Sequence, residues 1–194
     1  DFVDQVIGRS NHSWELSSTV KTRTKKTWNL LDKCLRSDKG IGFDSLMHYY
    51  HWENTENKEL EKALARHLQL SPRHSAPYAV NAGAALRSRF SGPEIIGGMT
   101  GTNVGFYGPQ GRVLRLPLQD PELNAKIEGF RFGEEKITNL EMETAGIYGL
   151  AQLLGHQALS LNAIVANRCT GEFSRDPANT VDSLIHYSLE QLVL

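Results

Sequence analysis

Residues 142–166 read METAGIYGLAQLLGHQALSLNAIVA and contain the two kinds of element from which we expect the fold to be built. Residues 142–154 predict a helix, because apolar positions recur on one face before Gly155 ends the run. That face consists of Ile147, Leu150, Ala151 and Leu154. Residues 158–166 form a mostly apolar run of strand length, which is typical of a strand buried on both faces of a sheet.

Other parts of the chain repeat this alternation. A helix is expected between a cap at Asn54 or Thr55 and a stop at Ser71-Pro72, and Asp176-Pro177 begins a last helix. Their apolar faces are Leu60, Ala63, Leu64 and Leu68 in the first, and Val181, Leu184, Ile185, Leu189 and Leu192 in the last. Residues 95–102 predict a glycine-rich strand. Alternating helices and buried strands predict the α/β class, as one domain with a largely parallel or mixed sheet flanked by helices.

The composition is that of an ordinary globular protein. The chain has 194 residues, 40% of them hydrophobic, and a formal net charge of −1, so it lacks the basic excess of a nucleic-acid binder. No stretch approaches the roughly 20 apolar residues of a membrane span. The two cysteines, Cys34 and Cys169, are too few for a disulfide scaffold. We therefore expect a cytoplasmic protein with neither nucleic acid nor membrane as its partner.

The first 37 residues differ from the rest of the chain. They contain the basic run Lys21-Thr22-Arg23-Thr24-Lys25-Lys26 and little apolar periodicity. Such a run is compatible with a nucleic-acid patch or a targeting signal, but a solvated segment is the more common explanation. We predict that residues 1–37 are an atypical basic segment, poorly ordered or not native-like, and that residues 38–194 form the domain.

A candidate for binding a flat heterocycle is Gly105-Phe106-Tyr107-Gly108-Pro109-Gln110-Gly111-Arg112. In extended backbone, side chains two positions apart point the same way, so Gln110 and Arg112 can reach one ligand. An amide and a guanidinium together complement a ring that bears two carbonyl oxygens with an N–H between them, such as uracil. Phe106 offers a surface for the ring to pack against. The alternative is a surface turn with solvated polar tips.

Two shorter motifs follow. Glu141-Met142-Glu143 lies at the start of the helix expected from residue 142, where acidic groups favour the helix dipole. Alternatively, Glu143 accepts two vicinal sugar hydroxyls while Met142 packs against the sugar. Asn167-Arg168 comes directly after residues 158–166, and ligands of α/β sheets often bind beyond such strand ends. A plain surface arginine is the other explanation for Arg168.

In this order the three motifs resemble the nucleoside phosphorylase family, and specifically its uridine phosphorylase branch. That branch carries a Phe-Tyr-x-x-Gln-x-Arg segment for uracil, a Glu-Met-Glu segment for ribose and an Asn-Arg pair after a late strand. The resemblance covers about residues 38–194. It implies that Phe106, Gln110, Arg112 and Arg168 bind the base, and that Glu141, Met142 and Glu143 bind the ribose. Arg112, Glu143 and Arg168 are the expected catalytic residues.

The resemblance also implies a reaction and partners. The expected activity is phosphorolysis of uridine, and possibly deoxyuridine, to uracil and ribose 1-phosphate in pyrimidine salvage. Inorganic phosphate is the co-substrate, no metal or organic cofactor is expected, and the family assembles as dimers or hexamers. Purine relatives carry Ser-Asp near residues 167–168, and its absence counts against a purine. A purine or methylthioadenosine phosphorylase, a nucleosidase of the same fold, or an inactive ligand-binding fragment are the alternatives.

The front of the chain departs from the family pattern. Nothing in residues 1–36 resembles the N-terminal half of the family, which carries the phosphate-binding arginines and a glycine-rich turn. The pair Gly8-Arg9 is too little to assign, so the phosphate-binding residues are not identified. We therefore expect a nucleoside phosphorylase-like domain that is incomplete at its N-terminus, from a truncated or frame-disrupted coding sequence.

Overall fold

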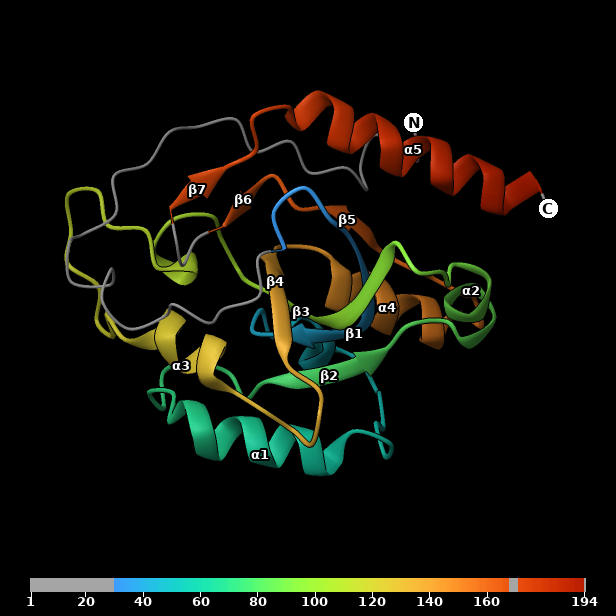
Figure 1. Ribbon diagram of the computed structural model, residues 1–194. Coiled ribbons are helices and arrows are strands. Elements are labelled where there is room, and N and C mark those ends of the chain that lie inside the picture. Colours follow the sequence, from blue (N-terminus) through green and yellow to red (C-terminus); the bar gives the residue numbers. More distant parts are fainter. Residues whose placement is uncertain (1–29, 168–170, 194) are drawn as a thin grey trace. The chain divides into compact units, whose positions relative to one another are not determined.

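The computed structural model describes residues 30–167 and 171–193 (Figure 1). These residues divide into two compact units. Of the described residues, unit 1 contains 30–36, 89–96, 161–167 and 171–193, and unit 2 contains 37–88 and 97–160. Each unit is described by itself below.

The strands are β1 (Cys34–Gly42), β2 (Tyr78–Asn81), β3 (Ile95–Thr102), β4 (Ile137–Glu141), β5 (Leu161–Ala163), β6 (Ala166–Asn167) and β7 (Glu172–Phe173). The helices are α1 (Lys58–Leu68), α2 (Ala84–Arg89), α3 (Leu123–Gly129), α4 (Thr144–Leu153) and α5 (Pro177–Val193), with short 3-10 turns η2 (Leu46–Tyr49) and η3 (Gly108–Gln110). The main sheet has the order β2-β1-β3-β4. Since β2 is antiparallel to β1 and β4 is parallel to β3, the sheet is mixed, and the predicted α/β class is confirmed.

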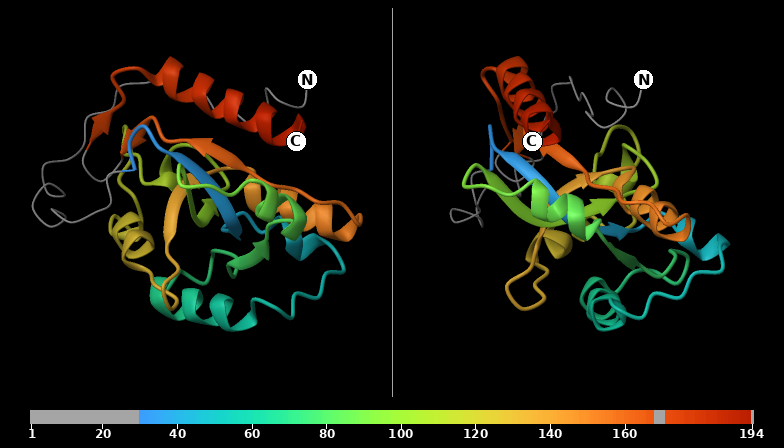
Figure 2. Two further views of the ribbon diagram at one scale, coloured as in Figure 1. Left: turned by 45° about the vertical axis from the view of Figure 1, so that its right-hand side comes forward. Right: turned by 90° about the vertical axis from the view of Figure 1, so that its right-hand side faces the viewer.

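In unit 2 the alternation of side chains along β2 separates two apolar cores. Ala79 faces one core, which contains three leucines of α1 and extends to α3. Its neighbours Tyr78 and Val80 face the other core, which contains Ala145 and Tyr148 of α4. Because successive residues of a strand point to opposite faces, α1 and α3 cover one face of the sheet and α4 covers the other (Figures 1 and 2).

Helix α1 agrees with its predicted face but not with its predicted cap. Leu60, Leu64 and Leu68 are all buried, as the spacing requires. The helix begins after Asn57, whose side chain makes no capping bond and instead donates to Ala79 O at 3.2 Å. The predicted caps at Asn54 and Thr55 are therefore wrong. The side-chain amide of Asn54 instead donates to Ala79 O of β2 and to Glu61 Oε1 at 2.9 Å.

Helix α4 is where the predicted face is wrong. Ile147 and Leu154 are exposed, whereas Thr144, Ala145, Gly146, Tyr148 and Gly149 are buried. The cause is a close approach to β1: a Cβ added at Gly40 would lie 2.6 Å from Ala145 Cα. The helix therefore buries its small residues together with Tyr148, and Ile147 and Leu154 lie outside this buried face.

Unit 1 contains an edge pairing and a helix. The first residues of β1 pair antiparallel with β5, from Cys34 opposite Ala163 to Arg36 opposite Leu161. Residues 158–166 do not form the continuous buried strand that the sequence predicts. They contain only the three-residue β5 and the start of β6, both mostly half-buried, because the antiparallel pairing with β1 is this short.

The last helix begins as predicted. Pro177 is the first residue of α5, and Asp176 Oδ1 accepts a bond from Asn179 N at 3.1 Å. Leu184 is buried, but Leu189 and Leu192 are more than half exposed, so the predicted apolar face is buried only in its first part.

The predicted boundary at residue 38 lies inside β1, which begins at Cys34. Polar residues in this strand hide it from periodicity, although Ser37 is fully buried and its hydroxyl lies 2.6 Å from Thr100 Oγ1. Among the helices of the described residues, none combines the length and the apolar character needed to cross a bilayer.

Candidate functional site

Two predicted motifs leave the sheet of unit 2 at the same edge. Strands β3 and β4 are parallel, and their last residues, Thr102 and Glu141, are partners in the register. One residue further, Asn103 N donates to Glu141 O at 2.8 Å. The loop after β3 leads to Gly105–Arg112, and the motif Glu141–Glu143 begins with the last residue of β4. Both motifs therefore start from adjacent strand ends, where α/β proteins commonly bind ligands.

The segment Gly105–Arg112, which we name the Gln-Arg turn, is a tight bend rather than extended backbone. Tyr107 O accepts bonds from Gln110 N at 3.1 Å and from Arg112 N at 3.0 Å. Pro109 fits the first turn of η3, and Gly111 supplies the left-handed φ of 74° that ends it. The sequence predicted extended backbone between Gln110 and Arg112, and this is wrong, because the backbone bends here.

The side chains of the Gln-Arg turn nevertheless gather. Gln110 is only 2% exposed, and its Oε1 accepts a bond from Arg112 Nη1 at 2.9 Å. The same guanidinium donates to Phe106 O and lies over the Phe106 ring, with Cζ 3.6 Å from the ring centroid. Partial burial lowers the pKa of Arg112 from its ordinary value, although the group stays charged. An amide, a guanidinium and an aromatic ring are thus held together within one turn.

The Glu141 carboxylate accepts hydrogen bonds from the backbone at the start of α4. Its Oε2 accepts bonds from Glu143 N and Thr144 N, each at 2.8 Å, and its Oε1 accepts one from Thr102 Oγ1 at 2.6 Å. These three donors use the carboxylate in the way that a helix-capping acid does. The geometry favours a role in which Glu141 positions its neighbours, whereas the predicted direct contact with ribose stays a prediction.

Glu143 occupies the N-cap position of α4, one residue before the helix and not within it as the sequence predicts. Its Oε2 accepts a weak bond from Met142 N at 3.2 Å, and both residues are exposed. Partial desolvation, followed by the charge of Glu141, raises the pKa of Glu143. A perturbed carboxylate at a strand edge is a typical candidate for binding or catalysis.

Sequence reasoning missed Thr102. Its hydroxyl donates to Glu141 and also accepts a bond from Ala145 N at 2.8 Å, so one buried oxygen connects the end of β3 to both the acid and the helix. Its position as the last residue before the Gln-Arg loop is the signal that could have singled it out. Of the third predicted motif, Asn167-Arg168, only Asn167 is among the described residues, and it ends β6 in unit 1. Arg168 lies outside the described residues.

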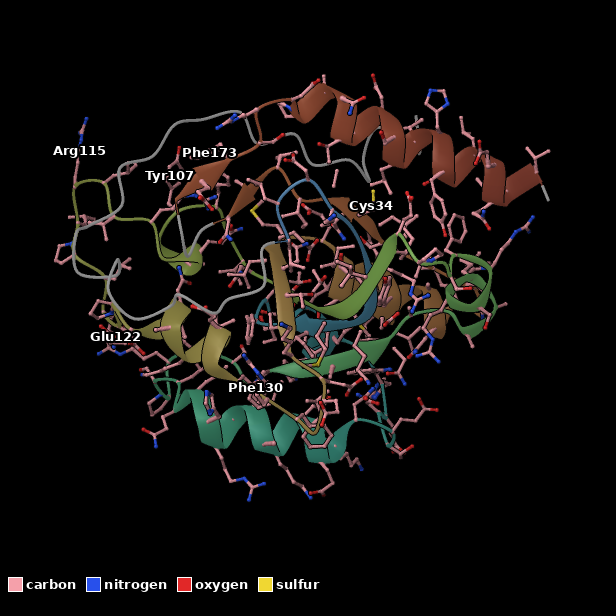
Figure 3. The ribbon with its side chains drawn as sticks, in the orientation of Figure 1. Cys34, Tyr107, Arg115, Glu122, Phe130 and Phe173 are labelled. Atoms are coloured by element: carbon pink, nitrogen blue, oxygen red, sulfur yellow. The ribbon has the colours of Figure 1, made fainter. Side chains whose placement is uncertain are left out.

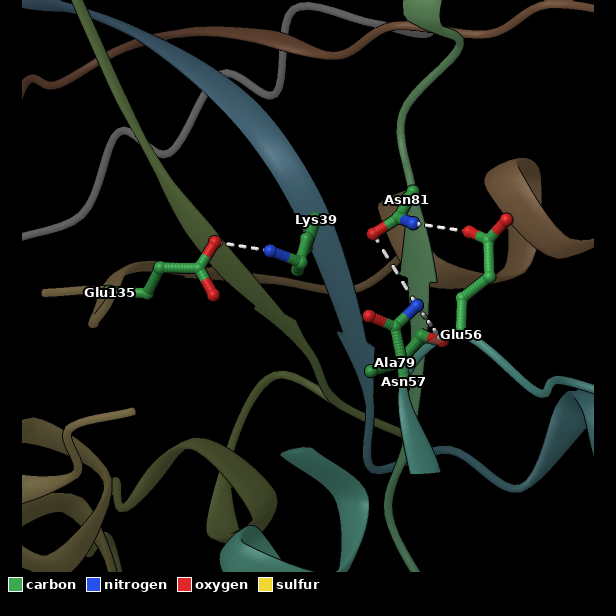
Figure 4. A network of polar contacts seen from close by, with 6 residues as sticks. All are labelled: Lys39, Glu56, Asn57, Ala79, Asn81 and Glu135. Carbon is green, nitrogen blue, oxygen red and sulfur yellow. Dashed lines mark hydrogen bonds and ion pairs between the residues drawn. The ribbon is translucent and has the colours of Figure 1, made fainter. Parts of the chain in front are cut away.

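A second polar region of unit 2 lies elsewhere. It surrounds a cavity of about 530 Å³, and none of the described residues that line it belongs to the predicted site. We name it the polar cavity. Figure 4 shows its contacts: Lys39 forms an ion pair with Glu135, and Asn81 Nδ2 donates to Glu56 Oε2 at 2.7 Å. Asn57 Nδ2 lies 3.4 Å from Asn81 Oδ1, so the polar groups here are partners of one another.

Figure 3 labels residues on both sides of α3. Tyr107 of the Gln-Arg turn and Glu122, the N-cap of α3, lie on one side, and Phe130, the C-cap, lies towards α1. Phe130 is buried in the core that it shares with α1, and its ring contacts His67 at 5.4 Å between centroids. Helix α3 is therefore anchored to the core at the end opposite the turn.

Comparison with known proteins places this geometry in context. No family model matches the chain. A uridine phosphorylase of Thermococcus kodakarensis is 34% identical over 84 residues, which are 40% of this chain and 27% of that protein. The chain therefore spans little more than a quarter of this curated relative.

Solved structures match over a longer stretch. A Trypanosoma brucei nucleoside phosphorylase that shows uridine phosphorylase activity has a TM-score of 0.74 at 24% identity, and the match covers 84% of this chain and 58% of that one. A futalosine hydrolase of Helicobacter pylori has a TM-score of 0.51 at 14% identity, covering 86% of this chain and 62% of that one. In each case less than two thirds of the neighbour is spanned. The described part of this chain thus has the nucleoside phosphorylase fold, and part of its sequence is similar to a uridine phosphorylase.

Proposed function

We propose that this chain carries the base- and ribose-recognition region of a uridine phosphorylase. The reaction would cleave uridine with inorganic phosphate to uracil and ribose 1-phosphate. The observation that carries the proposal is the Gln-Arg turn, in which Gln110, Arg112 and Phe106 contact one another in the loop after β3, while Glu143 follows the paired end of β4.

The chemistry of uracil supports the choice of base. Its edge presents a carbonyl oxygen on either side of an N–H, which an amide and a guanidinium complement with one acceptor and several donors. Cleavage of the nucleosidic bond leaves negative charge on the base, spread from N1 to both carbonyl oxygens. Arg112 would bind that developing charge more tightly than neutral uridine, and only such differential binding accelerates the step.

On the sugar side, the transition state resembles an oxocarbenium ion. The Glu143 carboxylate would accept the vicinal hydroxyls and favour the positive charge, with Glu141 and Thr102 holding the backbone that presents it. Phosphate would attack the anomeric carbon, and the residues that bind it are not identified. No metal or organic cofactor enters this scheme. The proposal also includes Arg168 as a residue that binds the base. It further includes a place in cytoplasmic pyrimidine salvage and assembly into a homo-oligomer.

Substrate profiling tests the proposal. The full chain is incubated with uridine, inosine and methylthioadenosine, each with and without phosphate, and calorimetry with uracil is run in parallel. Phosphate-dependent release of uracil from uridine supports the proposal. Release of base without phosphate indicates a nucleosidase, and turnover of inosine or methylthioadenosine alone indicates a purine enzyme. Uracil binding without turnover of any substrate identifies an inactive binding module.

A further inference from the structure

Helix α3 supplies a contact to the Gln-Arg turn that the proposed reaction does not itself assign. Asn124, in the first turn of α3, donates from Nδ2 to Gln110 O at 3.0 Å. That carbonyl belongs to the residue whose side chain bonds to the Arg112 guanidinium. The side-chain amide of Asn124 therefore holds the main chain at the point from which the predicted base-binding groups project.

The contact extends to Gly111, which lies between the two predicted base-binding residues. A Cβ at this position would lie 2.1 Å from Asn124 Nδ2 and 2.6 Å from Asn124 Cγ. Because such distances are impossible for a real side chain, the Asn124 amide packs directly on the Gly111 backbone. Gly111 also has a φ of 74°, so glycine is required here both for conformation and for space.

Asn124 is an unfavourable residue at this buried position unless its side-chain N–H group makes a hydrogen bond. Its Oδ1 is buried and has no hydrogen-bond partner among the described residues. A buried acceptor without a partner destabilises the folded chain, and an apolar side chain of similar shape would remove that cost. The Nδ2 bond to Gln110 is the contact that an apolar side chain could not replace.

We propose that Asn124 is a positioning residue for pyrimidine recognition. Its amide holds the bend between Gln110 and Arg112, so that the amide and the guanidinium meet the same edge of the base. This inference rests on the proposed function, because it assumes that the turn binds a pyrimidine. It assigns the selectivity of the site partly to a residue that does not touch the substrate.

Two ligands separate positioning from general stability. Uracil presents its free N3–H edge, whereas 3-methyluracil carries a methyl group on that edge. A side chain that only stabilises the fold would change the affinity for both compounds alike. Loss of a positioning contact would instead reduce the ratio of the two affinities, because the edge is no longer matched by a fixed pair of groups.

The experiment measures both affinities by calorimetry on the full chain and on three variants. Asn124→Leu removes the donor at similar shape, and Asn124→Asp replaces the donor at the same size. Lys126→Met on the same helix is the matched control, since it breaks the ion pair with Asp120, which precedes α3, without touching the turn. Thermal melts of all four proteins report folding, and Asn124→Asp serves if Asn124→Leu does not fold.

We expect the affinity for uracil to fall about tenfold in the Asn124 variants. The ratio of the affinities for uracil and 3-methyluracil should fall by a similar factor. Lys126→Met should keep the wild-type ratio. A wild-type chain that binds uracil selectively, together with folded Asn124 variants of unchanged ratio, would overturn the inference alone. A wild-type chain that does not bind uracil, or that binds both compounds equally, overturns the proposed base recognition and the inference with it.

Discussion

The polar cavity and the Gln-Arg turn both gather polar groups in unit 2, but they differ in how charge is balanced. In the cavity, Lys39 faces Glu135 and the neighbouring amides bond to each other and to Glu56. At the sheet edge beside the turn, Glu141 and Glu143 carry the same charge, and the pKa of Glu143 is raised. In the polar cavity the charged and amide groups therefore have opposite charges or amides as partners, whereas the two carboxylates after β4 repel each other.

This difference indicates where function is to be sought. Groups that are paired within the protein stabilise it or shape its surface, whereas groups held in an unfavourable state of ionisation are concentrated at functional sites. Glu143, with its pKa raised by desolvation and by the charge of Glu141, belongs to the second kind. The cavity volume and the perturbed pKa of Glu143 therefore point to different parts of unit 2.

The largest expected effect contrasts one cation from each region. Arg112→Ala should lower uridine turnover at least about a hundredfold, because loss of a charge-stabilising donor costs roughly 2.7–4 kcal/mol of barrier. Lys39→Met, in the polar cavity, should leave turnover within about twofold. Steady-state phosphorolysis of uridine measures both. Equal effects of the two substitutions would abolish the distinction between the regions.

A smaller effect is expected at the connection between β3 and α4. Thr102→Val removes a fully buried hydroxyl that donates to Glu141 and accepts from Ala145 N, so unfolding should become easier by about 1–3 kcal/mol. Thr138→Val is the matched control: it removes a single bond of 3.2 Å to Met99 O and should cost about 0.5 kcal/mol. Urea denaturation gives both free energies. If Thr138→Val lowers the free energy of unfolding as much as Thr102→Val does, the connection that Thr102 makes between β3 and α4 has no particular importance for stability.

The smallest effect is a dependence of stability on pH. Because the pKa of Glu143 is raised in the folded chain, its contribution to the free energy of unfolding is complete below its unfolded pKa of about 4.3 and is lost as the pH rises through the folded value. Because Gln resembles the protonated acid, the two proteins should be similarly stable at acid pH, and Glu143→Gln should become the more stable of the two as the pH rises. Urea denaturation from acid to neutral pH measures it.

Glu135→Gln removes one carboxylate from the polar cavity and is the control for that series. If the wild-type and Glu143→Gln curves run parallel at every pH, the unfavourable charge assigned to Glu143 is absent. The same titration should be visible in uridine binding, since only the ionised carboxylate accepts two hydroxyls, so the KM for uridine should rise on the acid side.

The sequence was sufficient for the parts of the fold that rest on local pattern. The leucines of α1 and the Asp176-Pro177 start of α5 follow from periodicity and capping. Strand β1 was missed because Ser37 is polar, although a partner 63 positions away satisfies it in the interior. The buried face of α4 was missed because small residues pack there against Gly40, and no single-sequence pattern reveals such an approach.

The candidate site shows the same division. Gln110, Arg112 and Glu143 lie in short contiguous motifs, so the sequence alone could propose them. Thr102 acts through a residue 39 positions away, and Asn124 acts through one 14 positions away, and both are ordinary polar residues in sequence. Residues that position others become visible only when the chain has brought their partners into contact.

Helix α4 packs so closely on β1 that any side chain at Gly40 would collide with the Ala145 backbone. A short helix is stiff along its axis, so displacing Ala145 would carry Glu143, two residues earlier, with it. If Glu143 binds the pentose as proposed, a substitution at position 40, on the sheet, would therefore change the pentose preference. Engineering that varies only the residues lining the sugar would never sample it.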